Sequence, residues 1–73
     1  MSTQGVVLFH TTSAAMRAEK TLLRAGLTVK LVPTPRHLSS DCGIALRFDW
    51  PAAAAARKLL EEANVPVAGV YPL

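Results

Sequence analysis

Apolar residues gather along this chain in four short runs, separated by segments with a different spacing of apolar and polar positions. Each run has the length typical of a strand, and the β-branched residues Val, Ile and Thr are frequent in them. The predicted strands cover residues 6–9, 28–32, 43–48 and 67–71. In the third run Ile44, Leu46 and Phe48 share one face. Alternation predicts that this face packs on a core, while Ala45 and Arg47 point away from it.

Two of the intervening segments have the three- and four-residue apolar spacing of amphipathic helices. The first is expected to begin near Ser13, because the hydroxyls of Thr11, Thr12 and Ser13 suit a helix N-terminus, and to end before a glycine. The second is rich in alanine, opens at 49–51 with a proline in its first turn and ends at 64–66.

This order of elements predicts an α+β, ferredoxin-like βαββαβ fold, with a four-stranded antiparallel sheet and two helices on one face. The chain, 1–73, is expected to form a single domain. Because a helix crosses from the first strand to the second, these two strands would be parallel. Their carboxyl ends then lie at one end of the sheet. We therefore expect residues 10–13 to face the loop at 36–43, and the N-terminus of the first helix to lie near Cys42.

The loop after the second strand is the longest predicted connection and holds the only cysteine of the chain. It runs from Pro33 to Gly43, whereas antiparallel strands are usually joined by roughly two to five residues. Its polar side chains belong to Thr34, Arg36, His37, Ser39, Ser40 and Asp41. This composition around one thiol indicates a functional loop.

Cys42 is the candidate reactive residue of that loop. A thiolate is stabilised by a helix N-terminus or a neighbouring cation, so the first helix, Arg36 and His37 are candidates to activate it. Gly43 leaves the backbone beside the thiol open to an approaching group.

Hydroxyl groups add donors for an anion at the same place, from Ser39 and Ser40 in the loop and from Thr11, Thr12 and Ser13 at the helix. The competing interpretation is structural, because an isolated cysteine at the start of a buried strand is often a small apolar core residue. The sequence leaves both interpretations open.

Composition narrows the class of protein. With 51% apolar and 18% charged residues, the chain is expected to fold. Its formal net charge is +3, but only four aromatic residues are present, too few for a nucleic-acid surface. The first apolar run is too short for a signal sequence or a membrane span, so we expect no membrane partner and a cytoplasmic location.

Motifs for known catalytic sites are missing from the sequence. There is no glycine-rich phosphate loop and no nucleophile elbow, so we expect no cofactor and favour a carrier over a stand-alone enzyme. His10, His37, Asp41 and Cys42 could ligate a metal, but they lack the CxxC or HxxxH spacing of zinc sites, and we expect no metal.

The sheet face away from the helices is expected to be apolar and therefore covered. The residues assigned to it are Val7, Phe9, Val32, Ala45 and Val70. A homodimer through this open face is the simplest cover, and a docked enzyme is the alternative.

Three motifs stand out along the chain: Phe9-x-x-Thr12, Ala15-x-x-Ala18-Glu19-x-x-Leu22 and Pro33-x-Pro35-Arg36-x-x-Ser39-Ser40-x-Cys42-Gly43. Together they resemble the family of small bacterial proteins known as DUF3343, described as selenium or sulfur carrier-like. The resemblance covers about residues 5–72.

The resemblance implies that Cys42 accepts sulfur or selenium as a persulfide or perselenide and passes it to a partner enzyme. Arg36 would then stabilise the anion, and Ser39, Ser40 and the Gly43 N–H would donate hydrogen bonds to it. The alternative is a non-catalytic module that binds a small anion or regulates a partner, with Cys42 in a packing role.

Overall fold

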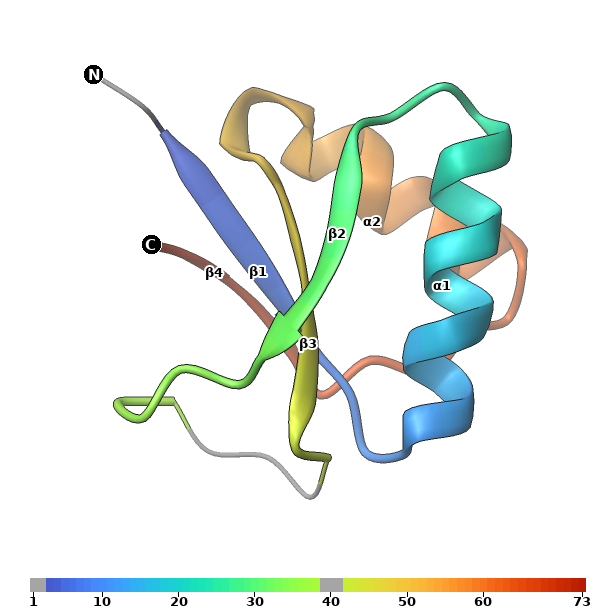
Figure 1. Cartoon of the computed structure of the whole chain (residues 1–73). Coiled ribbons are helices and arrows are strands. Elements are labelled where there is room, and N and C mark those ends of the chain that lie inside the picture. Colours follow the sequence, from blue (N-terminus) through green and yellow to red (C-terminus); the bar gives the residue numbers. More distant parts are fainter. Residues whose placement is uncertain (1–2, 39–41) are drawn as a thin grey trace.

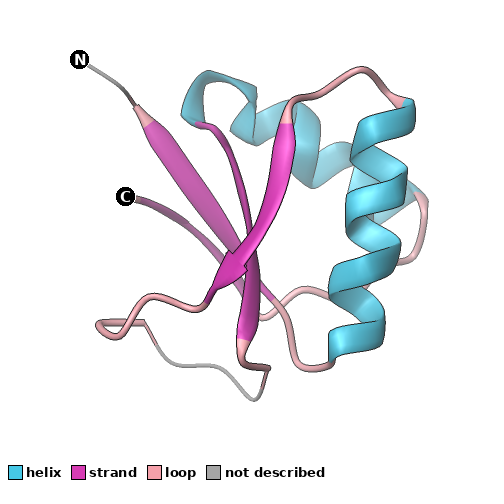
Figure 2. Ribbon diagram, in the orientation of Figure 1, coloured by secondary structure: helices cyan, strands magenta, loops and turns pink. Residues whose placement is uncertain are grey.

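The computed structural model describes residues 3–38 and 42–73 and contains one sheet and two helices (Figure 1). The strands are β1 (Gln4–Leu8), β2 (Val29–Pro33), β3 (Ile44–Asp49) and β4 (Gly69–Pro72). The helices are α1 (Thr12–Arg24) and α2 (Ala53–Glu62), with a short 3₁₀ turn, η1 (Trp50–Ala52), before α2. Both helices lie on the same side of the sheet (Figure 2). The predicted α+β, ferredoxin-like arrangement is confirmed.

The strand order is β2-β3-β1-β4, and every neighbouring pair is antiparallel. β1 and β3 are therefore central, with Leu8 opposite Ala45. β2 and β4 form the two edges. Pro33 ends β2, where an edge strand tolerates a residue without an N–H. The first and second strands run parallel with β3 between them, as the crossover predicts.

The main core lies between the sheet and the helices. Ile44, Leu46 and Phe48 of β3 all belong to it, which confirms the face predicted from their alternation. Its other large buried side chains include Leu22 of α1 and Leu60 of α2. The fully or nearly buried members are Val7, Phe9, Ala14, Ala15, Ala18, Leu22, Cys42, Leu46, Phe48, Ala56, Leu60 and Val65.

The assignment of β1 and β4 to the open face was wrong. Val7 and Phe9 are buried on the helix side, and Val70 packs against the same core. Val6 and Leu8 are the β1 residues that share the open face with Ala45. The run at 6–9 is apolar throughout, so it carries no alternation from which the inward-facing residues could be read.

The open face has its own small apolar cluster. Val6, Leu8 and Ala45 are buried there, and Val32 and Leu38 pack against them with Ala68. Side chains of the same chain therefore cover the centre of this face.

α1 begins one residue earlier than expected. Thr11 is its N-cap, and the Thr11 hydroxyl oxygen accepts a hydrogen bond of 3.1 Å from the Ala14 N–H. The helix ends at Arg24, and Gly26 follows with φ of +88°, a conformation that favours glycine.

α2 begins later than expected, because Pro51 lies in η1 and the α-helix starts at Ala53. Asp49 occupies the cap position of η1 without a side-chain cap hydrogen bond. After α2, Asn64 turns the chain with φ of +56°. The last strand is Gly69–Pro72 rather than 67–71.

Candidate functional site

Cys42 lies two residues before β3, at the end of the sheet where β1 leaves for α1. Its side chain is only 4% exposed and belongs to the main core, together with Phe9, Ala14 and Ala15. The thiol is therefore part of the packed interior at its boundary with the loop.

The first turn of α1 contacts the thiol. The Thr12 Oγ1 atom and the Cys42 Sγ atom are 3.7 Å apart, within hydrogen-bond distance for sulfur. Thr12 is the first residue of α1, where backbone N–H groups are left without helical partners and the helix dipole is positive. The predicted proximity of the helix N-terminus to Cys42 is confirmed.

Thr34, which the sequence did not single out for the site, holds the backbone at Cys42. Its hydroxyl donates a hydrogen bond of 2.9 Å to the Cys42 carbonyl oxygen. Its N–H donates one of 3.1 Å to the Gly43 carbonyl oxygen. These bonds extend the pairing of β2 with β3 past Pro33, opposite Ile44, and so tie the cysteine to the sheet. In the sequence, the only indication of this role is that a threonine directly follows the last residue of β2.

The two cationic candidates lie at a turn further along the loop. The Leu38 N–H donates to the Pro35 carbonyl oxygen at 3.0 Å, which closes a turn around Arg36 and His37. Both of these side chains are exposed, while Leu38 packs on the open face of the sheet. Ser39 and Ser40, and Asp41 after them, lie outside the described residues.

The remaining predicted residues surround Cys42 in different roles. Thr11 caps α1 through its hydroxyl, and Ser13 is exposed in the first helical turn. Gly43 is exposed, and a Cβ atom added to it would meet no atom of the described residues within 4 Å. Those residues leave the space beside Gly43 open.

A family profile described as "Putative Se/S carrier protein-like" matches residues 4–72. The match spans all four strands and both helices. The chain belongs to this Se/S carrier-like family. Searches of curated proteins and of solved structures each found no match.

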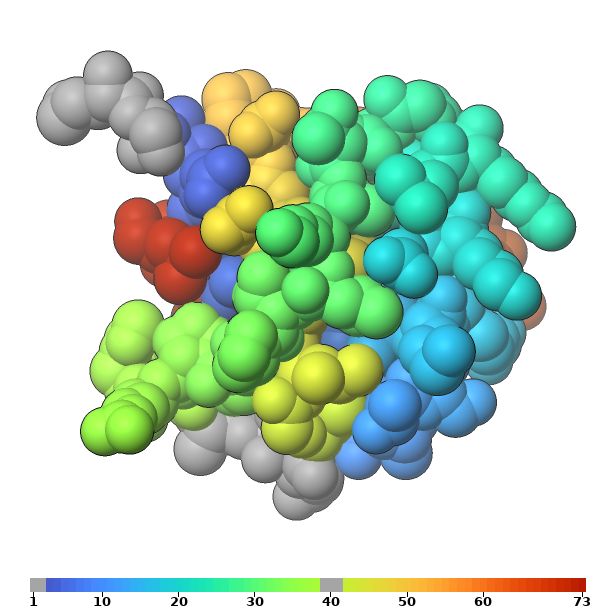
Figure 3. Space-filling model, viewed as in Figure 1, coloured from blue at the N-terminus to red at the C-terminus, as the bar shows by residue number. Residues whose placement is uncertain are grey.

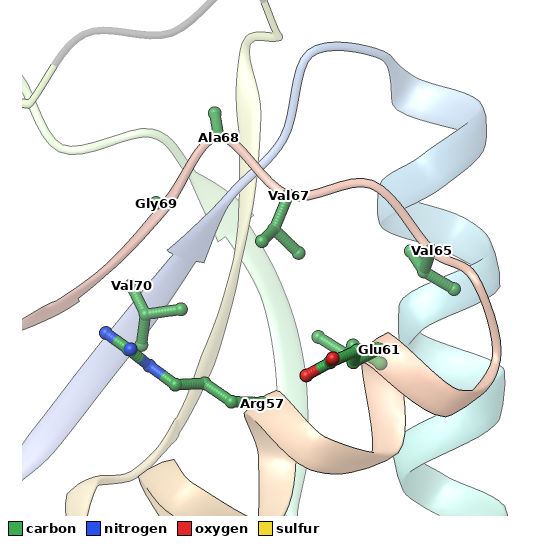
Figure 4. Close-up of a pocket in the computed structure, with 8 residues that line it drawn as sticks. Arg57, Glu61, Val65, Val67, Ala68, Gly69 and Val70 are labelled. Carbon is green, nitrogen blue, oxygen red and sulfur yellow. The ribbon is translucent and has the colours of Figure 1, made fainter.

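One pocket of this Se/S carrier-like protein lies away from Cys42. It has a volume of about 410 Å³ and lies between α2 and β4 (Figure 4). Leu60, Val65, Val67 and Val70 give it an apolar lining, with Arg57 and Glu61 from α2. None of the predicted site residues lines it, so it offers no support for chemistry at the thiol.

Within residues 3–38 and 42–73, no group of three or more His, Cys, Asp and Glu side chains is placed to hold a metal ion. In the same residues, no helix combines the length and apolar character needed to cross a membrane.

Proposed function

We propose that this protein carries a sulfur or selenium atom on Cys42, as a persulfide or perselenide, and delivers it to a partner enzyme. Membership of the Se/S carrier-like family supports a carrier role. Cys42 is proposed as the residue that holds the atom because of its position. It is the only cysteine in the chain, and its Sγ lies 3.7 Å from the hydroxyl of the first residue of α1.

The loading step balances without an added oxidant. The Cys42 thiolate attacks the outer sulfur of a persulfide on the donor enzyme, so a new S–S bond forms at Sγ. The donor's own S–S bond breaks, and its cysteine leaves as a thiolate that keeps the electron pair. Delivery is the same exchange, with a thiolate of the acceptor attacking the outer sulfur held on Cys42. With one cysteine per chain, any disulfide at Cys42 must join two molecules.

Groups around Cys42 would stabilise the negative charge on the attacking and transferred sulfur. The Thr12 hydroxyl, 3.7 Å from Sγ, would donate to an anionic sulfur, and the N-terminus of α1 would add its positive dipole. Arg36 and His37 contribute positive charge from the exposed turn. Ser39, Ser40 and the Gly43 N–H complete the proposed set of donors. Thr11 and Ser13 act through the helix end, Thr11 as its cap.

The burial of Cys42 favours a second candidate function. The Cys42 side chain is 4% exposed and belongs to the main core, which is typical of a cysteine with a packing role. In that case the protein is a non-catalytic module that binds a small anion or regulates a partner, and the sulfur takes no part in transfer. The two candidates differ in one measurable property, the reactivity of Cys42 in the folded protein.

Donor and acceptor enzymes are the proposed partners, in the reducing cytoplasm, where a thiol persists. A homodimer through the open face would bury little further apolar surface at its centre, because Val6, Leu8 and Ala45 are already buried in one chain.

The test is to incubate the protein with a cysteine desulfurase and cysteine, then measure its intact mass. The carrier function predicts a gain of one sulfur that a reductant reverses, and no gain in the Cys42→Ser variant. Alkylation of the native protein by iodoacetamide serves as the parallel measurement. If the thiol reacts only when the chain unfolds and no sulfur is gained, the packing role replaces the carrier function.

A further inference from the structure

One flank of α1 is apolar yet exposed. Met16 and Leu23 are 52% and 51% exposed, although large apolar side chains on a helix normally face a core. At 3.6 residues per turn, positions 12, 16 and 23 fall on one side of the helix. This side is separate from the buried stripe of α1, which consists of Ala14, Ala15, Ala18 and Leu22.

One end of this flank lies beside the Cys42 thiol. Its first residue is Thr12, whose hydroxyl contacts Cys42, and Met16 lies one turn further along the same side of α1. Arg17 shows where the other side of the helix faces, because its guanidinium donates a hydrogen bond of 3.3 Å to the Ala63 carbonyl oxygen beyond α2. The flank of Thr12, Met16 and Leu23 thus lies on the side of α1 away from α2.

Figure 3 shows α1 and the edge strand β2 side by side on one surface, with the start of β3 between them near the first turn of α1. A partner seated against this flank would therefore also meet the end of the sheet that holds Cys42.

Charge on α1 indicates the chemistry of the partner. Of its four charged residues, Lys20 and Glu19 lie at the two margins of the flank, and Lys20 is exposed whereas Glu19 is half-buried. Arg24 lies seven residues after Arg17 and therefore on the side of Arg17. A complementary surface would present an apolar patch with an acidic residue opposite Lys20.

We propose that the flank of Thr12, Met16 and Leu23 is the docking surface for the protein that donates the sulfur or selenium atom to Cys42. This proposal rests on the proposed carrier function. Transfer between two cysteines requires the donor to contact the protein beside the thiol. Among large exposed apolar residues in the described part of the chain, Met16 is the one a single helical turn from the residue that touches Sγ.

The experiment compares two donors with the same acceptor thiol. A cysteine desulfurase must dock, whereas glutathione persulfide is small enough to react without this flank. For the Met16→Gln/Leu23→Gln double variant, we expect transfer from the desulfurase to slow about tenfold, the effect of losing roughly 1.4 kcal/mol of contact energy. Transfer from glutathione persulfide should change less than about twofold.

The matched control is Leu73→Gln, because Leu73 is 56% exposed, Leu23 is 51% exposed, and Leu73 lies at the C-terminal end, outside the flank. The Leu73→Gln variant should leave both transfer rates unchanged. Leu23→Gln alone should slow transfer from the desulfurase and leave transfer from glutathione persulfide unchanged. A Lys20→Glu variant tests the charge argument and should also slow transfer from the desulfurase.

Each remaining outcome has a distinct meaning. If the double variant accepts sulfur from the desulfurase as fast as the wild type, the docking surface is wrong and the carrier function stands. The same holds if the wild type takes sulfur from glutathione persulfide but no faster from the enzyme. If the wild type takes sulfur from neither donor, the carrier function is wrong and the docking proposal falls with it.

Discussion

The Thr12 hydroxyl oxygen lies 3.7 Å from the Cys42 sulfur, although 30 residues separate them in the sequence. The contact joins the first turn of α1 to the start of β3. Because β1 and β2 are parallel with β3 between them, the fold brings these two segments to the same end of the sheet.

Replacing Thr12 by Val removes the hydroxyl and keeps the shape of the side chain. A thiolate has no proton to donate, so Thr12 must be the donor to an anionic sulfur. We expect the alkylation rate of native Cys42 at a fixed pH to fall about three- to tenfold, and stability to change by less than about 0.5 kcal/mol, since Val and Thr have similar helix propensities.

Thr12→Ser keeps the hydroxyl and should restore most of the rate. A faster reaction in Thr12→Val would contradict the assignment, because it would mean that the thiol donates to Thr12 and is held in its neutral form. Iodoacetamide kinetics followed by mass spectrometry measures all three proteins.

Gly5→Ala should destabilise the fold by about 1–3 kcal/mol through overpacking. A Cβ atom added at Gly5 would collide with the Trp50 ring and lie 3.0 Å from Cζ of Phe48. The two rings pack together with centroids 5.9 Å apart, so neither moves away without disturbing the other. Urea unfolding followed by Trp50 fluorescence gives the change in the free energy of unfolding.

Gly43→Ala is the comparison for that measurement, because no atom of residues 3–38 and 42–73 lies within 4 Å of its added Cβ. It should change the free energy of unfolding by less than about 0.5 kcal/mol. Equal losses in the two variants would show that the loss reflects glycine flexibility and not the clash with Trp50.

Arg17→Met should lower stability by about 0.5–1 kcal/mol. The side chain keeps its apolar stem but loses the 3.3 Å hydrogen bond to the Ala63 carbonyl oxygen, at the negative end of the α2 dipole. Thermal unfolding should show a lower midpoint by a few degrees.

Lys20→Met removes a positive charge from an exposed position of the same helix and serves as the control. If both variants lose the same stability, net charge and not the contact with α2 explains the effect.

Much of the fold follows from spacing alone. Alternation in β3 correctly placed Ile44, Leu46 and Phe48 on the core, because Arg47 between them marks the other face. The order of the elements then sufficed to bring Thr12 beside Cys42, since parallel strands connected by a helix end on the same side of a sheet.

The face of β1 was assigned wrongly because β1 has no polar residue among its apolar ones, as Arg47 is in β3. In β1, Val6 and Leu8 are buried on one face and Val7 on the other, so both faces look alike in the sequence. Leu38 was read as part of a polar loop, but it packs on the open face through a tertiary contact. Thr34 escaped notice for a similar reason, because its role is a backbone bond to Cys42 that residue type does not reveal.

Cys42 shares one buried cluster with Leu22, Leu46 and Phe48, so its sulfur is held by the side chains that hold the protein together. A cavity or a shift at any of these positions moves the sulfur as well as lowering stability. Under the proposed carrier function, selection on folding and selection on the reactivity of Cys42 therefore act through the same residues. A survey of tolerated substitutions would find that the positions required for folding and those required at the sulfur form one contiguous set.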